Sequence, residues 1–341
     1  MLDFTIDTLL HFLNLTLFNP LFCVLYLRVL QVMGHPLDGP LFRLSAAHTA
    51  FAACVWGLRW LAARFRRGRT VNWKEEVVVV TGGASGVGCL VAEMLATKAG
   101  KVAVLDVREV ESEQENVFYF QCDVSDAIQV NRVAAQIVEK LGHPTMLLNI
   151  AGIVAGKTIL GLTESEIRRG VDVNLLAHFW TVKAFLPEMV RRDRGHVVTM
   201  ASALAFAGCP QAAEYCAAKS ALLAFHESLR YELKTRSSPF SYNAPHVRTT
   251  LLCPGGISTA LFRGVYYPIP FVTPVLEPTA VADEILRALD EDCGRTVYKP
   301  FYVNLMPLMR ALPVEARDLI MAVMGPNEAM RTWTGYKLKD Q

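Results

Sequence analysis

Short runs of apolar and β-branched residues alternate with longer amphipathic segments along most of this 341-residue chain. Runs of this length suit buried parallel strands, and the segments between them have helical periodicity. Strands are expected at residues 76–81, 101–106, 117–122, 145–149, 195–200, 246–253 and 295–299. Helices are expected after the first strand through residue 98, and at 127–141, 164–191, 212–233 and 280–290. This alternation predicts an α/β fold with a doubly wound parallel sheet.

Two apolar stretches, residues 8–33 and 44–63, precede this pattern, and polar residues interrupt both of them. A spanning helix needs about 20 largely apolar residues, so each stretch is an imperfect span. Arg64, Arg66, Arg67 and Arg69 follow the second stretch, and such residues favour the cytoplasmic side. We expect residues 1–70 to form a spanning hairpin, a single span or interfacial helices, or else a soluble helical cap. The domain that follows is expected in the cytoplasm.

The composition supports contact with lipid and argues against several other partners. Hydrophobic residues make up 52% of the chain and charged ones 19%, whereas a soluble domain usually carries about 25% charge. Some apolar surface is therefore expected to face lipid or a lipid-like ligand. The net charge of +2 does not favour nucleic acid. The cysteines form no C-x-x-C pair or zinc-like spacing, so we expect free thiols and no metal site.

A glycine-rich turn, TGGASGVG at residues 81–88, follows the first expected strand. Gly82, Gly86 and Gly88 lack Cβ atoms, so the backbone can turn sharply and approach a pyrophosphate. The amide groups and positive dipole end of the next helix would hold that anion. Ser85 and Val87 lie in the same turn. The turn predicts a dinucleotide site, with a plain glycine turn as the alternative.

Asp106 ends the second expected strand, 18 residues after Gly88. A carboxylate there can accept hydrogen bonds from both ribose hydroxyls of adenosine. It would also repel a 2′-phosphate, which favours NAD over NADP as the cofactor. Arg108 lies two residues further on and weakens that preference.

At these motifs the chain resembles the short-chain dehydrogenase/reductase family, over roughly residues 75–300. The resemblance implies a Rossmann-like sheet and further cofactor contacts in several short motifs. These contacts are Asp123 and Val124 in C-D-V, Asn149, Ala151 and Gly152 in N-I-A-G, Pro254, Gly255, Ile257 and Thr259 in P-G-x-x-x-T, and Tyr215 with Lys219. Ile150 departs from the family's second asparagine, which could loosen a hydrogen bond in that turn.

Tyr215 and Lys219 are four residues apart on an expected helix, so they share one face. An ordinary tyrosine has a pKa of about 10, and a neighbouring ammonium should lower it. Such a tyrosine could act as base in alcohol oxidation and as acid in carbonyl reduction. Ser202 would hydrogen-bond the substrate oxygen, and the resemblance implies that Asn174 holds a water linking Lys219 to solvent. A lone Tyr-x-x-x-Lys would be an ordinary helix pattern.

Two further segments bear on the ends of the site. The crossover at residues 107–116 is near the lower limit for a parallel connection, so any helix there is at most a turn or two. This predicts an open adenosine end.

The lid at residues 260–272 is rich in aromatic and aliphatic side chains, which suits a bulky, water-insoluble alcohol or ketone. Alternatively, these side chains pack on the domain or dip into the membrane.

Three parts are therefore expected: membrane-associated helices at residues 1–70, a dinucleotide-binding catalytic domain at 71–300, and an apolar amphipathic carboxyl-terminal extension at 301–341. The extension could lie on the bilayer near the lid. Such ends resemble the membrane-bound branch of the family that includes retinol dehydrogenases and 17-beta-hydroxysteroid dehydrogenases. That resemblance implies a retinoid, a steroid or another lipid alcohol as substrate.

The resulting functional hypothesis is an NAD(P)-dependent oxidoreductase of lipophilic alcohols and carbonyls. An acyl-chain ketoreductase of lipid synthesis and a non-catalytic lipid-droplet or reticulum protein are the alternatives. We expect membrane lipid as a contact, a site in the endoplasmic reticulum or on lipid droplets, and a homodimer paired through the two long helices.

Overall fold

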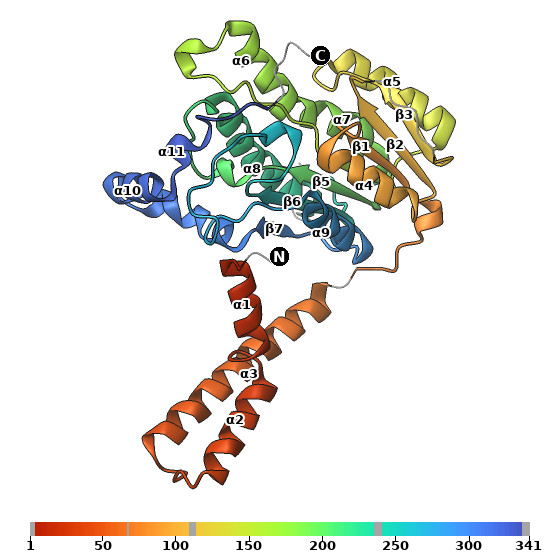
Figure 1. Ribbon diagram of the computed structural model, residues 1–341. Helices are drawn as coiled ribbons and strands as arrows, with labels where there is room; N and C mark the ends of the chain where they lie inside the picture. Colours follow the sequence, from red (N-terminus) through yellow and green to blue (C-terminus); the bar gives the residue numbers. More distant parts are fainter. Residues whose placement is uncertain (1–3, 67, 109–113, 235–240, 336–341) are drawn as a thin grey trace. The chain divides into compact units, whose positions relative to one another are not determined.

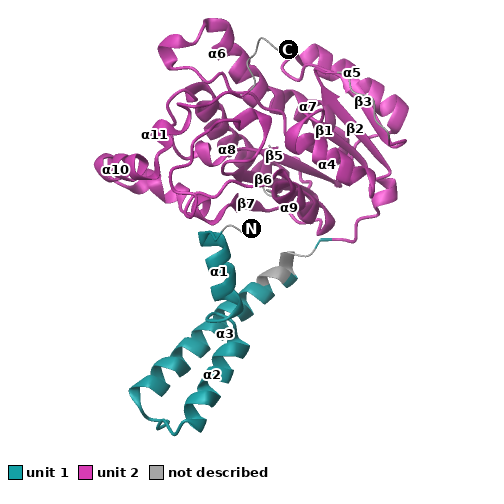
Figure 2. Cartoon of the chain, in the orientation of Figure 1, with its two compact units in different colours: residues 1–68 teal, residues 69–341 magenta. Residues whose placement is uncertain are grey.

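The computed structural model of the chain describes residues 4–66, 68–108, 114–234 and 241–335 (Figure 1). Arg67, residues 109–113 of the short crossover and residues 336–341 of the expected extension lie outside the described residues, as does the side chain of Arg66. The chain divides into two compact units, Met1–Gly68 and Arg69–Gln341 (Figure 2). The division into three parts at residues 70 and 300 stays a prediction.

The second unit is built on a parallel sheet with the strand order β3-β2-β1-β4-β5-β6-β7. Its strands are β1 (Val77–Thr81), β2 (Lys101–Asp106), β3 (Val117–Gln121), β4 (Met146–Asn149), β5 (Gly195–Met200), β6 (Val247–Pro254) and β7 (Thr296–Lys299). The register pairs Val79 with Ala103 on one side and with Leu147 on the other. The doubly wound, Rossmann-like sheet expected from the sequence is thus confirmed, with strand ends that differ by at most one residue.

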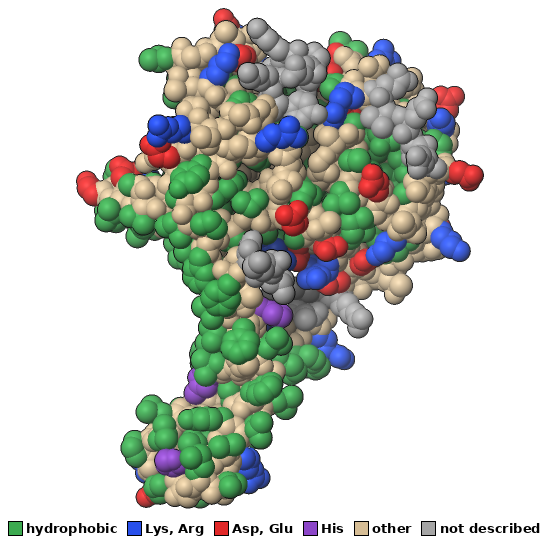
Figure 3. All heavy atoms as spheres, viewed as in Figure 1, with side chains coloured by type: hydrophobic (Ala, Val, Ile, Leu, Met, Phe, Trp, Pro, Cys, Tyr) green, Lys and Arg blue, Asp and Glu red, His purple; other side chains and the backbone are tan. Residues whose placement is uncertain are grey.

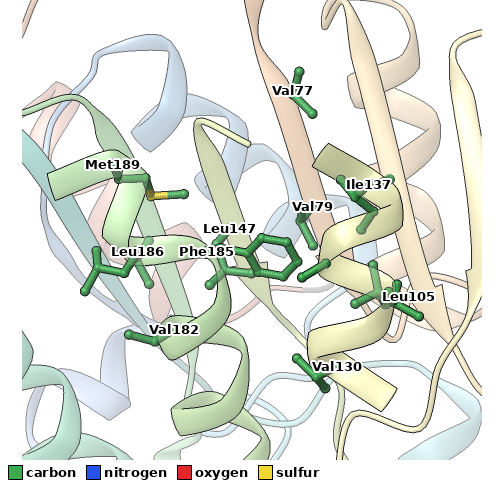
Figure 4. Close-up of a cluster of buried hydrophobic side chains, with 14 of the residues drawn as sticks. Val77, Val79, Leu105, Val130, Ile137, Leu147, Val182, Phe185, Leu186 and Met189 are labelled. Atoms are coloured by element: carbon green, nitrogen blue, oxygen red, sulfur yellow. The ribbon is translucent and has the colours of Figure 1, made fainter. Parts of the chain in front are cut away.

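Helices cover both faces of this sheet, so β1 is buried on both sides. Val78 and Val80 pack with α4 (Gly86–Ala96) and α9 (Pro278–Asp290) on one face. Val77 and Val79 face the cluster that includes side chains of α5 (Ala127–Leu141), α7 (Ala177–Arg191) and α8 (Ala213–Lys234). Figure 4 shows Phe185 and Leu186 of α7 beside the sheet residues in that cluster. This double burial explains why β1 is an unbroken valine run rather than an alternating pattern.

The prediction of a single continuous α-helix at residues 164–191 is wrong in the middle of that range. The structure has α6 (Glu164–Val171), a π-helical turn η3 (Asp172–Leu176) and then α7. A capping box begins α6, because Thr163 accepts a hydrogen bond from the Glu166 amide and the Glu166 carboxylate accepts one from the Thr163 amide. A π turn inserts an extra residue into the helical ladder, and such turns are frequent at functional sites. The hydrophobic periodicity of the sequence does not indicate where this π turn lies.

The first unit contains α1 (Ile6–Leu15), α2 (Pro20–Val32) and α3 (Pro40–Arg66). Among the described residues, one segment, Pro40–Leu61 of α3, is long and apolar enough to cross a membrane. The pair α1 and α2 passes the same test only when counted as one span bent by 60°. Most large apolar side chains of this unit are exposed, and Figure 3 shows hydrophobic side chains gathered over it. Length and composition are therefore consistent with membrane association.

The region after β6 forms the lid and a carboxyl-terminal segment that returns to it. These parts contain η5 (Ala260–Phe262), η6 (Phe301–Asn304), η7 (Met306–Ala311), α10 (Val314–Met324) and α11 (Pro326–Ala329). Shorter 3-10 turns elsewhere are η1 (Trp73–Glu75), η2 (Ile159–Gly161) and η4 (Ala203–Ala205).

Candidate active site

A cavity of about 210 Å³ opens at the carboxyl edge of the sheet. Its floor is formed by the ends of β1, β2, β4, β5 and β6, including Gly82, Asp106, Met200 and Pro254. The strand order reverses between β1 and β4, and open α/β sheets bind their ligands at this switch point. The residues that the sequence motifs single out all line this cavity, except Asn149 and Asn174.

The backbone of the glycine turn between β1 and α4 lies so close to other backbone atoms that a Cβ atom would not fit at Gly82 or Gly88. Gly82 has a φ of +69°, and a Cβ there would lie 2.8 Å from the Cα atom of Ala151. A Cβ on Gly88 would lie 2.2 Å from the carbonyl oxygen of Gly82. Gly86 also has a positive φ, +56°, and begins α4. The turn therefore presents bare backbone and a helix amino terminus to the cavity, which fits the pyrophosphate of a dinucleotide.

At the adenosine end, the carboxylate of Asp106 is nearly buried and already accepts two backbone hydrogen bonds. The amide of Ala84 donates to Oδ2 at 3.0 Å, and the amide of Arg108 donates to Oδ1 at 3.1 Å. The Arg108 guanidinium lies 3.7 Å from the same carboxylate. The two amides fix the carboxylate at the end of β2, where its remaining lone pairs can accept from ribose hydroxyls.

Asp123 has a partner that the sequence motifs did not indicate. Nη1 of Arg169 donates to Oδ2 of Asp123 at 2.5 Å and to the Ser125 hydroxyl at 3.0 Å. Burial alone would raise the pKa of Asp123, but hydrogen bonds from Arg169 and Ser125 outweigh it and lower the pKa. Arg169 lies on α6 and also lines the cavity. No spacing rule connects a helix arginine to a loop 46 residues away, so only the tertiary structure reveals it.

The catalytic candidates Ser202, Tyr215 and Lys219 meet beside the end of β5. The side chains of Ser202 and Tyr215 share a hydrogen bond. The ammonium of Lys219 lies 5.6 Å from the centroid of the Tyr215 ring and donates to the carbonyl oxygen of Met200 at 2.8 Å. The helix α8 presents both Tyr215 and Lys219 to the cavity, as their spacing predicts.

The expected lowering of the tyrosine pKa is wrong for this arrangement. Burial raises the pKa of Tyr215 above its ordinary value, and the hydrogen bond from Ser202 only partly offsets that effect. Burial also lowers the pKa of Lys219 to about 8. Both shifts have the same cause, since a low-dielectric site disfavours the charged form of either group. Near neutral pH the site thus holds a neutral phenol beside a lysine whose ammonium loses its proton at a lower pH than an ordinary lysine does.

Asn174 and Asn149 are buried next to the cavity without lining it. Asn174, in the π turn, accepts from the amide of Ile153 at 3.0 Å and donates to the carbonyl oxygen of Ile153 at 2.8 Å. A Cβ on Gly152 would lie 3.1 Å from Oδ1 of Asn174 and 3.7 Å from Nζ of Lys219. Asn174 therefore ties the loop after β4 to the helix near Lys219. Asn149 accepts from the Thr181 hydroxyl at 2.9 Å, which joins β4 to α7.

The substrate side of the cavity is walled by apolar side chains. Leu261 and Phe262 of the lid line it, as does Val154 from the loop after β4. The rings of Tyr215 and Phe262 pack edge to face, with centroids 5.8 Å apart. Other lining residues that the motifs did not single out are Leu105, Val107, Cys122, Ile153, Val173, Met200 and Ala201. Several of them end a strand or follow one, so the rule that ligands bind at strand ends could have found them.

Comparison with known proteins agrees with this geometry. Residues 76–266 match the family model of short chain dehydrogenases. The chain is 32% identical over 279 residues to epidermal retinol dehydrogenase 2 of Homo sapiens, which covers 79% of this chain and 88% of that relative. It is 28% identical over 275 residues to estradiol 17-beta-dehydrogenase 11 of Macaca fascicularis, which covers 78% and 88%. The chain belongs to the short chain dehydrogenase family.

A solved structure supports the same assignment. A short chain dehydrogenase from Burkholderia cenocepacia J2315, in complex with NADP, is similar with a TM-score of 0.59 and 25% identity, over 75% of this chain and 100% of that one. The present short chain dehydrogenase is therefore an NAD(P)-dependent oxidoreductase that acts on CH–OH groups. The expected family and its retinol and steroid dehydrogenase branch are confirmed.

Proposed function

We propose that this dehydrogenase interconverts a lipophilic primary or secondary alcohol and its carbonyl compound. The observation that carries this proposal is the apolar wall beside Tyr215, formed by Val154, Leu261 and Phe262. A hydrocarbon group bound against these side chains would leave water, which stabilises the complex. The names of the two relatives, a retinol and an estradiol dehydrogenase, agree with a lipid alcohol.

The proposed chemistry places the reacting oxygen between Ser202 and Tyr215. Ser202 hydrogen-bonds that oxygen, and Tyr215 donates a proton to it in reduction or accepts one in oxidation. When bound, the nicotinamide cofactor supplies or accepts the hydride. Because burial raises the pKa of Tyr215, the phenol predominates near neutrality and can protonate a carbonyl. Oxidation uses the minor phenolate form, which the nearby Lys219 ammonium favours electrostatically.

We propose that protons move between Tyr215 and solvent along a path that includes Lys219 and Asn174. The contact of Asn174 with Ile153 fixes this helix position near Gly152, and Nζ of Lys219 lies close to the same glycine. A water held there would connect the ammonium to solvent.

We further propose that NAD is preferred over NADP. The Asp106 carboxylate, fixed at the end of β2 by two amides, would repel a 2′-phosphate. The Arg108 guanidinium at 3.7 Å weakens this repulsion, so the preference is expected to be modest.

The proposal extends to a membrane location, in the endoplasmic reticulum or on lipid droplets, with the catalytic unit in the cytoplasm. It is supported by the exposed apolar side chains of α1, α2 and α3 and by the segment Pro40–Leu61. In the second unit, α10 also exposes Val314, Leu319 and Val323. Alkaline carbonate extraction of membranes tests it: release into the supernatant would exclude the spanning arrangements, whereas retention with the pellet supports them.

A homodimer paired through α7 and α8 is likewise proposed. These helices expose Phe179 and Tyr231, which could contact a second copy. The mass of the purified protein in detergent, measured by light scattering, tests this pairing.

The function itself is tested by a substrate panel. Purified full-length protein is incubated with NAD or NADP and with retinols, sterols and long-chain alcohols, and formation of NADH or NADPH is followed by absorbance. In a parallel arm it is incubated with NADPH and 3-ketoacyl compounds, and consumption of NADPH is followed. Turnover of at least one apolar alcohol, with small water-soluble alcohols poor, supports the proposal. Turnover of 3-ketoacyl compounds alone with NADPH would instead identify an acyl-chain ketoreductase.

A further inference from the structure

The carboxyl-terminal segment at residues 329–334 is hydrogen-bonded to the lid. Backbone and side-chain groups of this segment meet backbone groups of residues 261–266 in several places. The contacts are Trp333 Nε1 to the Leu261 carbonyl at 2.9 Å, the Thr332 hydroxyl to the Gly264 carbonyl at 2.7 Å, the Thr334 amide to the Arg263 carbonyl at 2.9 Å, and the Tyr266 amide to the Ala329 carbonyl at 2.9 Å. The segment therefore acts as a strap along the lid, and we call residues 329–334 the strap.

The indole of Trp333 also packs on the loop after β4, at Gly156. Gly156, in the loop after β4, has a φ of +68°, and a Cβ there would lie 2.1 Å from an indole carbon of Trp333. The ring thus packs directly on bare backbone at Gly156, while its Nε1 donates to the lid at Leu261. Trp333 therefore joins the lid to the loop that carries Val154, and both the lid and Val154 line the cavity.

Met330, in the same strap, packs in the buried cluster that contains Tyr215. Its side chain is 4% exposed and belongs to a buried cluster with Val154, Tyr215 and Cys216. Phe262 of the lid packs against that cluster. The apolar surroundings of the Tyr215 ring are therefore completed by a residue far beyond residue 266, where the match to the family model ends.

We propose that Met330 and Trp333 determine substrate specificity in this dehydrogenase. Met330 does not itself line the cavity, but it packs with the wall residues Val154 and Tyr215. Its volume therefore limits how far this wall can yield to bulk next to the carbinol carbon, and Trp333 holds the lid closed over the apolar end of the substrate. The enzyme then selects alcohols that are narrow at the reacting carbon and carry their apolar bulk further away. This inference rests on the proposed function, because it assigns the substrate class of the same site.

The first test replaces Met330 by alanine in the full-length protein. The measured quantity is the ratio of kcat/KM for an α-branched secondary alcohol to that for a primary alcohol of the same carbon number. We expect Met330→Ala to raise this ratio about tenfold or more, since one or two methylenes in an apolar pocket change discrimination by about 10–200-fold. Met330→Leu, which keeps the volume, should keep the wild-type ratio. An unchanged ratio in a folded Met330→Ala protein would overturn the proposal.

The second test needs no turnover and addresses Trp333. Trp333→Phe keeps an aromatic ring against Gly156 and removes the hydrogen bond to Leu261. We expect hydrogen exchange of the Tyr266 amide, which is bonded to Ala329, to accelerate about three- to tenfold. Trp73→Phe is the matched control, because its Nε1 donates to Asp290 at the same 2.9 Å distance and its ring packs on a different hydrophobic cluster, the one that contains Val78 and Val80.

The outcomes separate this inference from the proposed function. A wild-type protein that oxidises no alcohol in the panel refutes the proposed function, yet the exchange measurement still decides whether the strap holds the lid. An active wild type with an unchanged alcohol ratio in Met330→Ala refutes the specificity role alone. Equal exchange of the Tyr266 amide in wild type, Trp333→Phe and Trp73→Phe would refute the holding of the lid.

Discussion

The ammonium of Lys219 donates a hydrogen bond to the carbonyl oxygen of Met200, 2.8 Å away at the end of β5. The sheet itself therefore holds the lysine in place, and the ammonium lies 5.6 Å from the ring centroid of Tyr215. The side chain is buried, which lowers its pKa to about 8. Both residues lie on α8, and the hydrogen bond to β5 fixes the lysine relative to the tyrosine. The pKa values of both side chains differ from their ordinary values.

Removing the phenol should separate chemistry from cofactor binding. Tyr215→Phe keeps the ring packed on Phe262 and removes the group proposed to exchange a proton with the substrate oxygen. We expect kcat to fall by about 10²–10⁴-fold, the usual range for a general acid or base, while the Kd for NADH stays within about twofold. Initial rates and NADH fluorescence titration check these values. Tyr242→Phe, on an exposed tyrosine, is the control, and near wild-type turnover of Tyr215→Phe would refute the assignment.

The buried lysine predicts a pH-dependent stability. The pKa of Lys219 is about 8 in the folded protein and near the ordinary 10.5 when unfolded. Between these pH values the unfolded chain binds more protons, so the folded state gains stability as the pH rises. Lys219→Met lacks this gain. We expect the free energy of unfolding of wild type relative to Lys219→Met to increase by on the order of 2–3 kcal/mol from pH 8 to 10.5.

Urea unfolding at several pH values measures this difference. Lys98→Met is the control, because that side chain is partly exposed and its removal should leave the pH slope as in wild type. Parallel slopes for wild type and Lys219→Met would show that Lys219 is not held in a low-dielectric site.

The cofactor preference is expected to depend on one charge. Asp106→Asn keeps an oxygen that can accept from the Ala84 amide but removes the negative charge that would repel a 2′-phosphate. We expect the ratio of kcat/KM for NADP to that for NAD to rise about tenfold, since 1.4 kcal/mol of lost repulsion corresponds to that factor. Asp126→Asn, at the cap of α5, should leave the ratio unchanged. An unchanged NADP-to-NAD ratio in Asp106→Asn would show that other groups discriminate between the two cofactors.

Arg169 is expected to support cofactor binding through Asp123. Arg169→Met removes the ion pair at 2.5 Å and leaves the Asp123 carboxylate without its cation. We expect the Kd for NADH to rise about three- to tenfold, because hydrogen bonds to charged groups contribute about 1.5–3 kcal/mol and water replaces part of that. The neighbouring Arg168→Met is a matched control, since that side chain is largely exposed and pairs only with Glu164 among the described residues. Equal affinities of the two variants would show that Arg169 has no part in binding.

The local sequence was sufficient for the strands, the glycine turn and the Tyr215–Lys219 pair. Each depends on a short period or on a fixed offset: four buried valines in β1, glycines where a Cβ would collide with backbone, and an i, i+4 spacing on a helix. These features are decided within one or two turns of chain, so they can be read without knowing what packs against them.

Other features exist only because distant segments meet. Arg169 finds Asp123 across 46 residues, the strap at residues 329–334 lies on a lid some 65 residues earlier in the chain, and the π turn at Asn174 replaces the continuous helix expected there. The raised pKa of Tyr215 belongs here too, because burial by the whole fold outweighs the hydrogen bond from Ser202. Period and spacing report local geometry, whereas desolvation and long-range contacts depend on the packed structure, and only the tertiary structure could decide them.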